Sequence, residues 1–394
     1  MSRKLYLDNA ATKRVKKEVI DEMGKYFDEL YGNPSSQLYE LGRKSKEAIE
    51  KSRKIVADFL NAEEKEIYFT AGGTESDNWA LKGVAFANFN KGKNHIITTK
   101  IEHHAIIHTC EYLEKFGIET TYLDVDRYGL IDLEKLKEAI RPETMLISIM
   151  FANNEIGTIQ HIEEIGEIAK DNGVLFHVDA VQALGSVKID VKKQHIDLMS
   201  MSAHKISGPK GVGALYIKKG TKIDNFIHGG GQERGRRAGT EGVQNIVGFG
   251  KAVEIAARDF NNNEKLIALR NRLIEGIKNN IPDVVLNGHP TQRLPNNVNF
   301  SYKYVEGESI LLLLDMEGIA ASSGSACTSG SLDPSHVLLA TGLDHGTAHG
   351  SIRFTLSEEI TEEDIDFVVE TMKKIITKLR AMSPIKNDED LKKN

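Results

Sequence analysis

The sequence predicts an α/β protein in which a larger domain, built on a mostly parallel sheet between helices, is joined to a smaller α+β domain. Short apolar runs alternate with amphipathic helical segments from residue 66 to residue 217. This alternation is typical of crossover connections and of a parallel sheet that is covered on both faces. It ends at a Gly- and Arg-rich segment, 228–242, and the chain of 394 residues is long enough for two domains.

The spacing of apolar residues predicts the individual elements. Strands are expected at 4–7, 66–70, 95–99, 120–123, 145–151, 174–178, 198–202 and 213–217. Helices are expected at 15–30, 45–60, 74–89, 103–115, 132–140 and 162–171. After the Gly- and Arg-rich segment we expect helices at 243–259 and 266–279, strands at 297–302 and 320–323, and a helix from Thr361, whose Thr-Glu-Glu-Asp resembles a capping box.

The change of pattern also predicts the domain organisation. We expect a large domain at 15–259 and a small domain that combines 1–14 with 260–394. The small domain would carry a Gly- and Ser-rich loop at about 322–334, which contains Cys327.

Composition excludes several classes of protein. The net charge of -6 argues against a nucleic acid or an anionic membrane as the main partner. No apolar run is long enough to cross a bilayer, and the first residues contain no apolar signal core. With only two cysteines, Cys110 and Cys327, no disulfide framework is expected. We therefore expect a reduced, cytoplasmic protein.

Polar residues follow several of the predicted strands, at the edge where open parallel sheets bind ligands. Lys205 lies in a turn after the strand at 198–202, among Ser202, His204 and Ser207. It is either a solvated surface charge or an amine that forms a Schiff base with a carbonyl cofactor. Asp179 directly follows the strand at 174–178. It serves either as a salt-bridge partner or cap, or as the partner of a protonated pyridine nitrogen.

The other strand ends carry weaker signals. Gly72 and Gly73 open a helix whose N-terminus is suited to a phosphate, although no Walker sequence follows. His104 and His108 have the spacing of a metal pair, but no third ligand stands at a suitable distance along the chain, so no metal site is predicted.

The two cysteines differ in their surroundings. Cys110 shares an apolar stripe with its helix neighbours, which predicts a buried and inert thiol. Cys327 lies among glycines and serines. It is either an incidental thiol in a flexible linker or a nucleophile that uses the exposure.

Six motifs together resemble the pyridoxal-phosphate cysteine desulfurases. They are Gly73-Thr-Glu-Ser, Asn153-Asn-Glu-Ile-Gly157, His177-Val-Asp179-Ala-Val-Gln182, Ser202-Ala-His-Lys205-Ile-Ser-Gly-Pro-Lys-Gly211, His228-Gly-Gly-Gly-Gln-Glu-Arg-Gly-Arg-Arg-Ala-Gly-Thr240 and Ser322-Ser-Gly-Ser-Ala-Cys327. The likeness extends from Tyr6 to about Pro384. The continuation of the cysteine loop to Leu338 is similar to the class with an extended loop, and the ending 379–384 is similar to the nitrogen-fixation (NifS-like) branch.

The resemblance implies a fold, a cofactor and roles for named residues. The fold would be that of aspartate aminotransferase (fold type I), with pyridoxal 5'-phosphate bound covalently to Lys205. Asp179 would pair with the ring nitrogen, Gln182 with the phenolic oxygen, and His103 would stack on the ring and carry protons. The implied cofactor contacts are Gly73, Thr74, His103, Asn154, Asp179, Gln182, Ser202, His204, Lys205 and, from a second subunit, Thr240. The implied substrate contacts are Asn33, Asn154 and Arg353.

The implied reaction converts L-cysteine to L-alanine and leaves the sulfur as a persulfide on Cys327. The sulfur would then pass to an iron–sulfur scaffold protein or another acceptor, with Cys327 contacting the iron–sulfur cluster during transfer. Nitrogenase cluster assembly, general iron–sulfur biogenesis and tRNA thiolation would all use the same site, in a homodimer. Two alternatives stay open at this point: a related pyridoxal-phosphate lyase or aminotransferase that does not need Cys327, and a non-catalytic iron–sulfur scaffold protein.

Overall fold

The computed structural model describes residues 4–88, 91–260, 263–323 and 334–384. Cys327 and most of its loop lie outside these residues. The strands are β1 (Leu5–Tyr6), β2 (Ile67–Thr70), β3 (His95–Thr99), β4 (Glu119–Leu123), β5 (Thr144–Ser148), β6 (Leu175–Asp179), β7 (Leu198–Ser202), β8 (Gly213–Ile217), β9 (Val284–Leu286), β10 (Asn297–Tyr302), β11 (Ile319–Ala320) and β12 (Ser351–Thr355).

The helices follow the predicted order. They are α1 (Lys17–Asp28), α2 (Glu40–Leu60), α3 (Gly73–Asn88), α4 (His104–Glu114), α5 (Leu133–Ala139), α6 (Ile162–Asp171), α7 (Val243–Asp259), α8 (Asn263–Asn280), α9 (Gly307–Met316), α10 (His336–Ala340), α11 (His345–His349) and α12 (Glu362–Met382), with 3-10 turns η1 (Glu64–Glu66), η3 (Ala203–Ile206) and η4 (Glu233–Gly235). The capping box predicted at Thr361 is present, since the side chains of Thr361 and Asp364 each accept the other's backbone N–H.

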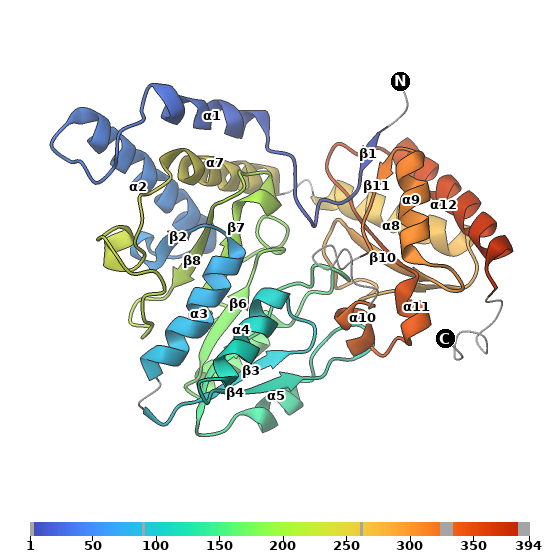
Figure 1. Cartoon of the computed structure of the whole chain (residues 1–394), viewed down its shortest axis with the longest axis horizontal. Helices are drawn as coiled ribbons and strands as arrows, with labels where there is room; N and C mark the ends of the chain where they lie inside the picture. Colours follow the sequence, from blue (N-terminus) through green and yellow to red (C-terminus); the bar gives the residue numbers. More distant parts are fainter. Residues whose placement is uncertain (1–3, 89–90, 261–262, 324–333, 385–394) are drawn as a thin grey trace.

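A seven-stranded sheet with the order β2-β8-β7-β6-β5-β3-β4 forms the larger half of the described chain. The five strands from β7 to β4 are parallel, whereas β8 runs antiparallel to both of its neighbours. Helices cover both faces, which confirms the predicted mostly parallel α/β sheet (Figure 1). The inner strands β3, β5 and β7 are buried at every residue, as is typical of a covered parallel sheet, whereas the edge strand β4 is partly exposed.

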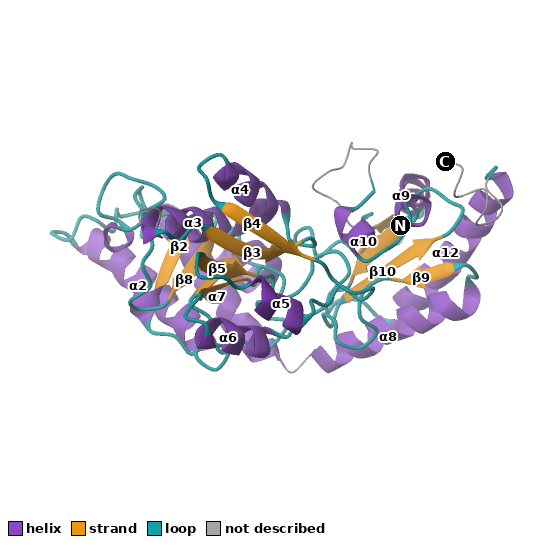
Figure 2. Ribbon diagram, turned by 90° about the horizontal axis from the view of Figure 1, so that it is seen from below, coloured by secondary structure: helices purple, strands orange, loops and turns teal. Residues whose placement is uncertain are grey.

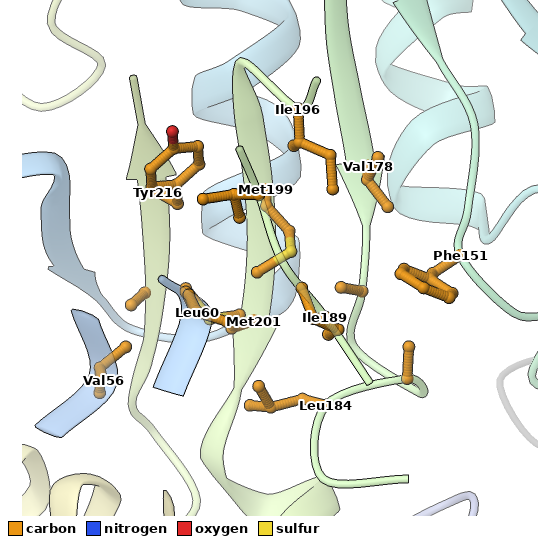
Figure 3. Close-up of a cluster of buried hydrophobic side chains, with 14 of the residues drawn as sticks. Val56, Leu60, Phe151, Val178, Leu184, Ile189, Ile196, Met199, Met201 and Tyr216 are labelled. Atoms are coloured by element: carbon orange, nitrogen blue, oxygen red, sulfur yellow. The ribbon is translucent and has the colours of Figure 1, made fainter. Parts of the chain in front are cut away.

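Different helices build the cores on the two faces of this sheet. On one face, side chains of adjacent strands, such as Val178, Met199 and Tyr216, gather with Val56 and Leu60 of α2 (Figure 3). On the other face, α3 and α4 contribute a second core that contains Cys110. Cys110 is fully buried, as predicted, and burial raises the pKa of its thiol to about 12.

The last third of the chain forms a separate layer around an antiparallel sheet with the order β12-β10-β9. Helices α8 and α12 pack together against it, and Figure 2 shows this part beside the larger half. The first residues of the chain belong here, because β1 pairs with β11 and Leu5 and Leu7 enter this core (Figure 1). The exact division, 15–259 against 1–14 plus 260–394, stays our proposal.

A few elements differ from the prediction. The apolar run at 145–151 is longer than β5, because Ile149, Met150 and Phe151 stay buried where the chain leaves the sheet. Helix α2 begins at Glu40 and not at residue 45, since its first turn is largely polar and has no apolar periodicity. Helices α9, α10 and α11 and strands β9 and β12 were not predicted. Among the described residues, no helix combines the length and the apolar character that crossing a bilayer requires.

Candidate active site

A cavity of about 370 Å³ lies at the carboxyl ends of β5, β6 and β7. The loop after β3, the N-terminus of α3, the segment after β1 and strand β12 complete its wall. It is lined by Ala10, Ala11, Gly73, Thr74, Asp77, His103, Met150, Ala152, Asn154, Asp179, Val181, Gln182, Ser202, His204, Lys205 and Arg353. Most of the residues predicted from the strand ends therefore meet in one place, as the topology of a parallel sheet requires.

Lys205 stands in the 3-10 turn η3, directly after β7, and its amine is fixed inside the cavity wall. Its Nζ donates hydrogen bonds to the carbonyl oxygens of Ala10 and Ala11, at 2.5 and 2.9 Å. The turn ends at Ser207, whose φ of 62° reverses the chain. This geometry excludes the solvated surface charge that the sequence left open.

Asp179 is the last residue of β6 and is buried in the cavity wall. Its Oδ1 accepts the backbone N–H of Val181 at 2.9 Å. Burial raises the pKa of its carboxyl to about 6, while the Val181 N–H and the charge of Lys205 act in the opposite direction. A buried carboxylate of this kind is suited to a cationic partner.

The N-terminus of α3 and the end of β7 form an anion-binding corner. The first backbone N–H groups of a helix have no partner within the helix, and the first residues of α3, Gly73 and Thr74, line the cavity. A Cβ at Gly73 would lie 2.6 Å from Cγ2 of Val181, so only glycine permits this close approach. Ser202 and His204 complete the corner, and burial, followed by the charge of Lys205, lowers the pKa of His204 to about 4.

His103 caps α4 and faces the cavity. Its Nδ1 accepts the backbone N–H of Ala105 at 3.1 Å, so the neutral ring carries its proton on Nε2. Burial, and next the charge of Lys205, lowers its pKa. The ring is therefore neutral near pH 7 and can accept or return a proton.

Arg353 comes from the other sheet. It lies in the middle of β12, is 2% exposed, and donates from Nη2 to Asp8 at 2.8 Å and from Nη1 to the carbonyl of Asn154 at 2.9 Å. A guanidinium fixed in this way at a cavity wall is suited to binding a carboxylate.

The structure brings together all but three of the predicted site residues. Thr240 lies in an exposed segment between η4 and α7, and Asn33 lies in an exposed loop between α1 and α2. Neither lines this cavity. Cys327 falls outside the described residues. Within the described residues, no group of three or more His, Cys, Asp or Glu side chains is arranged to hold a metal ion.

Several lining residues were not predicted from the sequence. Asp77 had a detectable signal, because it interrupts the apolar stripe of α3 that continues through Ala80, Leu81 and Val84. Ala10 and Ala11 contribute through their carbonyl oxygens, for which the sequence holds no signal. The neighbouring Asp8 also escaped notice.

Comparison with known proteins agrees with this geometry. Residues 5–368 match the family model of the class-V aminotransferases. The chain is 61% identical to a protein named cysteine desulfurase IscS from Methanosarcina thermophila, over 97% of this chain and 94% of that protein. A protein of the same name from Dictyoglomus turgidum is 53% identical over the full length of both chains. The chain belongs to the cysteine desulfurases of the class-V aminotransferase family.

The fold of this cysteine desulfurase is also similar to solved structures. A NifS-like protein is 40% identical, with a TM-score of 0.90, and the match covers 96% of this chain and 100% of that one. SspA in complex with cysteine is 37% identical, with a TM-score of 0.78, over 89% and 98% of the two chains. Enzymes of this family use pyridoxal phosphate. The cavity of this cysteine desulfurase fits that group in three respects: an amine for the aldehyde, a buried carboxylate for the ring nitrogen and a helix N-terminus for the phosphate.

Proposed function

We propose that this cysteine desulfurase binds pyridoxal 5'-phosphate in the Lys205 cavity and uses it to convert L-cysteine to L-alanine. The observation that carries the proposal is the meeting of Lys205, Asp179 and the N-terminus of α3 around one cavity. A solvated lysine or a structural salt bridge would not require these three groups to converge.

Different lining residues would hold different parts of the cofactor. Lys205 would hold the aldehyde carbon, Asp179 the ring nitrogen and Gln182 the phenolic oxygen. Gln182 is already oriented, since its Nε2 donates to the carbonyl of Ala10 at 3.0 Å. Gly73, Thr74, Ser202 and His204 would hold the phosphate, with Thr240 reaching it from a second subunit of a homodimer. His103 would stack on the ring.

The chain's own groups then perform the reaction on cysteine. Pyridoxal phosphate, when bound, withdraws electrons from the α-carbon of the substrate and so makes its proton removable. The amine of Lys205 takes that proton and returns one to the product. Arg353 and Asn154, with Asn33 as a helper, hold the substrate on its carboxylate side. His103 exchanges a proton at Nε2 with the incoming thiol.

Sulfur leaves the substrate on Cys327. The thiolate of Cys327 attacks the substrate sulfur, an S–S bond forms, and the bond from that sulfur to the substrate's β-carbon breaks. The electron pair of the broken bond and one proton, supplied by His103, complete the methyl group of alanine, while Lys205 returns the proton of the α-carbon, so cysteine and one thiol become alanine and one persulfide. We further propose that the persulfide sulfur passes to an iron–sulfur scaffold or another acceptor, in the cytoplasm.

The test compares Cys327→Ala with a control at the other cysteine, Cys110→Ala. Cys327→Ala should retain the absorbance of the bound cofactor and lose persulfide formation, as seen by mass spectrometry of the chain after addition of cysteine. Cys110→Ala should still form the persulfide, because Cys110 is buried in a core away from the cavity.

Two results would overturn the proposal, and each favours a different alternative. Unchanged release of sulfur by Cys327→Ala would favour a related lyase or aminotransferase. A protein that remains colourless with pyridoxal phosphate, and to which borohydride attaches no cofactor at Lys205, would favour the non-catalytic scaffold.

A further inference from the structure

An ion pair joins the Gly- and Arg-rich segment, 228–242, to the first turn of α3. Nε of Arg237 donates to Oε1 of Glu75 at 2.8 Å, and Nη2 of Arg237 donates to Oε2 at 3.0 Å. The two side chains are 20% and 13% exposed, so solvent reaches little of either. Two parallel hydrogen bonds between a guanidinium and a carboxylate form the strongest and most directional kind of ion pair in proteins.

Glu75 also has a structural role in the turn before α3. Its Oε2 accepts the backbone N–H of Ala71 at 3.0 Å. A negative charge in the first turn of a helix is favourable, because the N-terminus of a helix carries a partial positive charge. The preceding residue, Thr74, lines the Lys205 cavity at the corner proposed for the phosphate. The carboxylate that stabilises the turn is therefore a neighbour of the place where a second anion would bind.

Two anions at one helix end repel each other unless a cation neutralises one of them. Gly73, Thr74 and Glu75 belong to one helical turn. Such a turn is about 5.4 Å long, and physiological salt screens charges over about 8 Å. Salt alone therefore does not remove the repulsion, and an unpaired Glu75 would weaken the binding of a phosphate at this corner. The guanidinium of Arg237 supplies the neutralising charge.

The fold holds the segment on both sides of Arg237. Before it, the carboxylate of Glu233 is 2% exposed and accepts Nη2 of Arg53 on α2 at 2.7 Å. After it, the backbone N–H of Ala238 donates to the carbonyl of Ile227 at 3.3 Å. The guanidinium is thus in place without any contribution from a bound cofactor.

We propose that Arg237 is a positioning residue for the phosphate of the cofactor, because its guanidinium neutralises Glu75 and so keeps the N-terminus of α3 favourable to a second anion. The inference rests on the proposed function and adds a residue that does not itself line the cavity. A purely structural ion pair would instead fasten the segment that carries Thr240. The two roles differ in what they predict for substitutions at the two ends of the pair.

The test compares two variants that break the same ion pair. Absorbance titration of the cofactor-free protein gives the Kd of pyridoxal phosphate and, as an internal reference, the Kd of pyridoxal, which has no phosphate. Arg237→Gln leaves the charge of Glu75 unpaired, so its Kd for pyridoxal phosphate should rise on the order of 10-fold, and its Kd for pyridoxal should not change. Glu75→Gln removes the repelling charge and should bind pyridoxal phosphate at least as tightly as the wild-type protein.

A double variant tests whether Arg237 acts through Glu75. Arg237→Gln combined with Glu75→Gln should recover the wild-type Kd for pyridoxal phosphate, because no unpaired carboxylate remains. Equal losses of affinity in the two single variants, or a double variant as weak as Arg237→Gln, would overturn the proposal and leave the pair a structural role alone. Urea unfolding of each variant checks that it is folded under the conditions of the titration.

Arg236→Gln is the matched control, since it removes the same charge from the neighbouring position. The guanidinium of Arg236 lies over the ring of Tyr68, 5.8 Å from its centre, and Arg236 does not line the Lys205 cavity. Its Kd for pyridoxal phosphate should equal that of the wild-type protein. A rise as large as that of Arg237→Gln would show that the net charge of the segment matters and not the pair with Glu75. Failure of the wild-type protein to bind pyridoxal phosphate would instead refute the proposed function.

Discussion

The two sheets that border the cavity supply its residues by different geometric rules. The seven-stranded sheet contributes through its strand ends, since Asp179, Ser202 and Lys205 stand where β6 and β7 stop. Its parallel strands end at a common edge, so the loops that follow them converge. The three-stranded antiparallel sheet contributes Arg353 from the middle of β12, where side chains alternate between faces. Ile352 and Phe354 enter the core of the small half, and Arg353 faces the other way.

This difference separates cofactor chemistry from substrate binding. The edge of the large sheet brings together an amine, a buried acid and a helix N-terminus suited to an anion, the groups that chemistry on a cofactor requires. The small sheet holds one guanidinium at a fixed place, through Asp8 and the Asn154 carbonyl. Substitutions at the edge of the seven-stranded sheet should therefore abolish the reaction. Substitutions in the three-stranded sheet should weaken the binding of the substrate.

The largest effect is expected at Lys205. Lys205→Ala removes the amine that we propose both holds the cofactor and acts as the base, so alanine formation should fall on the order of 10³-fold or more. After borohydride treatment, mass spectrometry should find no cofactor attached to the chain. Lys210→Ala, an exposed lysine five positions along, should match the wild-type protein in both measurements. Retained turnover in Lys205→Ala would break the assignment of chemistry to the large sheet.

A smaller and different effect is expected at Arg353. Arg353→Gln loses a charged hydrogen bond of about 1.5–3 kcal/mol, which corresponds to a KM for cysteine that is about 10- to 100-fold higher. The absorbance of the bound cofactor should not change, because Asp179, Lys205 and the N-terminus of α3 remain. A variant with unchanged KM and a much lower kcat would show that Arg353 acts in the chemistry. The two sheets would then not divide catalysis and substrate binding between them.

The contrast between the two sheets also explains which site residues could be predicted from the sequence. Lys205 and Asp179 were accessible from the residues alone, because apolar strands can be recognised and their last residues share an edge. Arg353 was found only through the family resemblance. Its strand had not been recognised, and nothing in one antiparallel strand indicates which face meets a cavity.

Other features needed three-dimensional information. Ala10 and Ala11 act through backbone oxygens, which every residue has, so their contact with Lys205 depends on where the chain after β1 runs. Asp77 occupies an apolar position of α3, and recognising it as part of the site requires knowing that Asp179 faces the same cavity. The roles of all the site residues, with those of Thr240, Asn33 and Cys327 among them, stay predictions.

The smallest expected effect concerns His95, at the opposite, amino end of the same sheet. His95 opens β3 and lies between the hydroxyls of Thr144 on β5 and Thr121 on β4, at 2.8 and 2.9 Å. Burial, and next the charge of Arg141, lowers its pKa to about 4. The folded state thus binds this proton less tightly than the unfolded chain, whose histidine pKa is about 6.5. Its contribution to stability is complete above that pH and is lost as pH falls toward 4.

His95→Gln should therefore lose less stability than the wild-type protein in urea unfolding between pH 6.5 and 4, and it should retain wild-type alanine formation at neutral pH. Equal slopes in the two proteins would show that His95 is protonated without cost in the folded state. His95 is not among the residues that line the Lys205 cavity, so its substitution should change stability in acid alone.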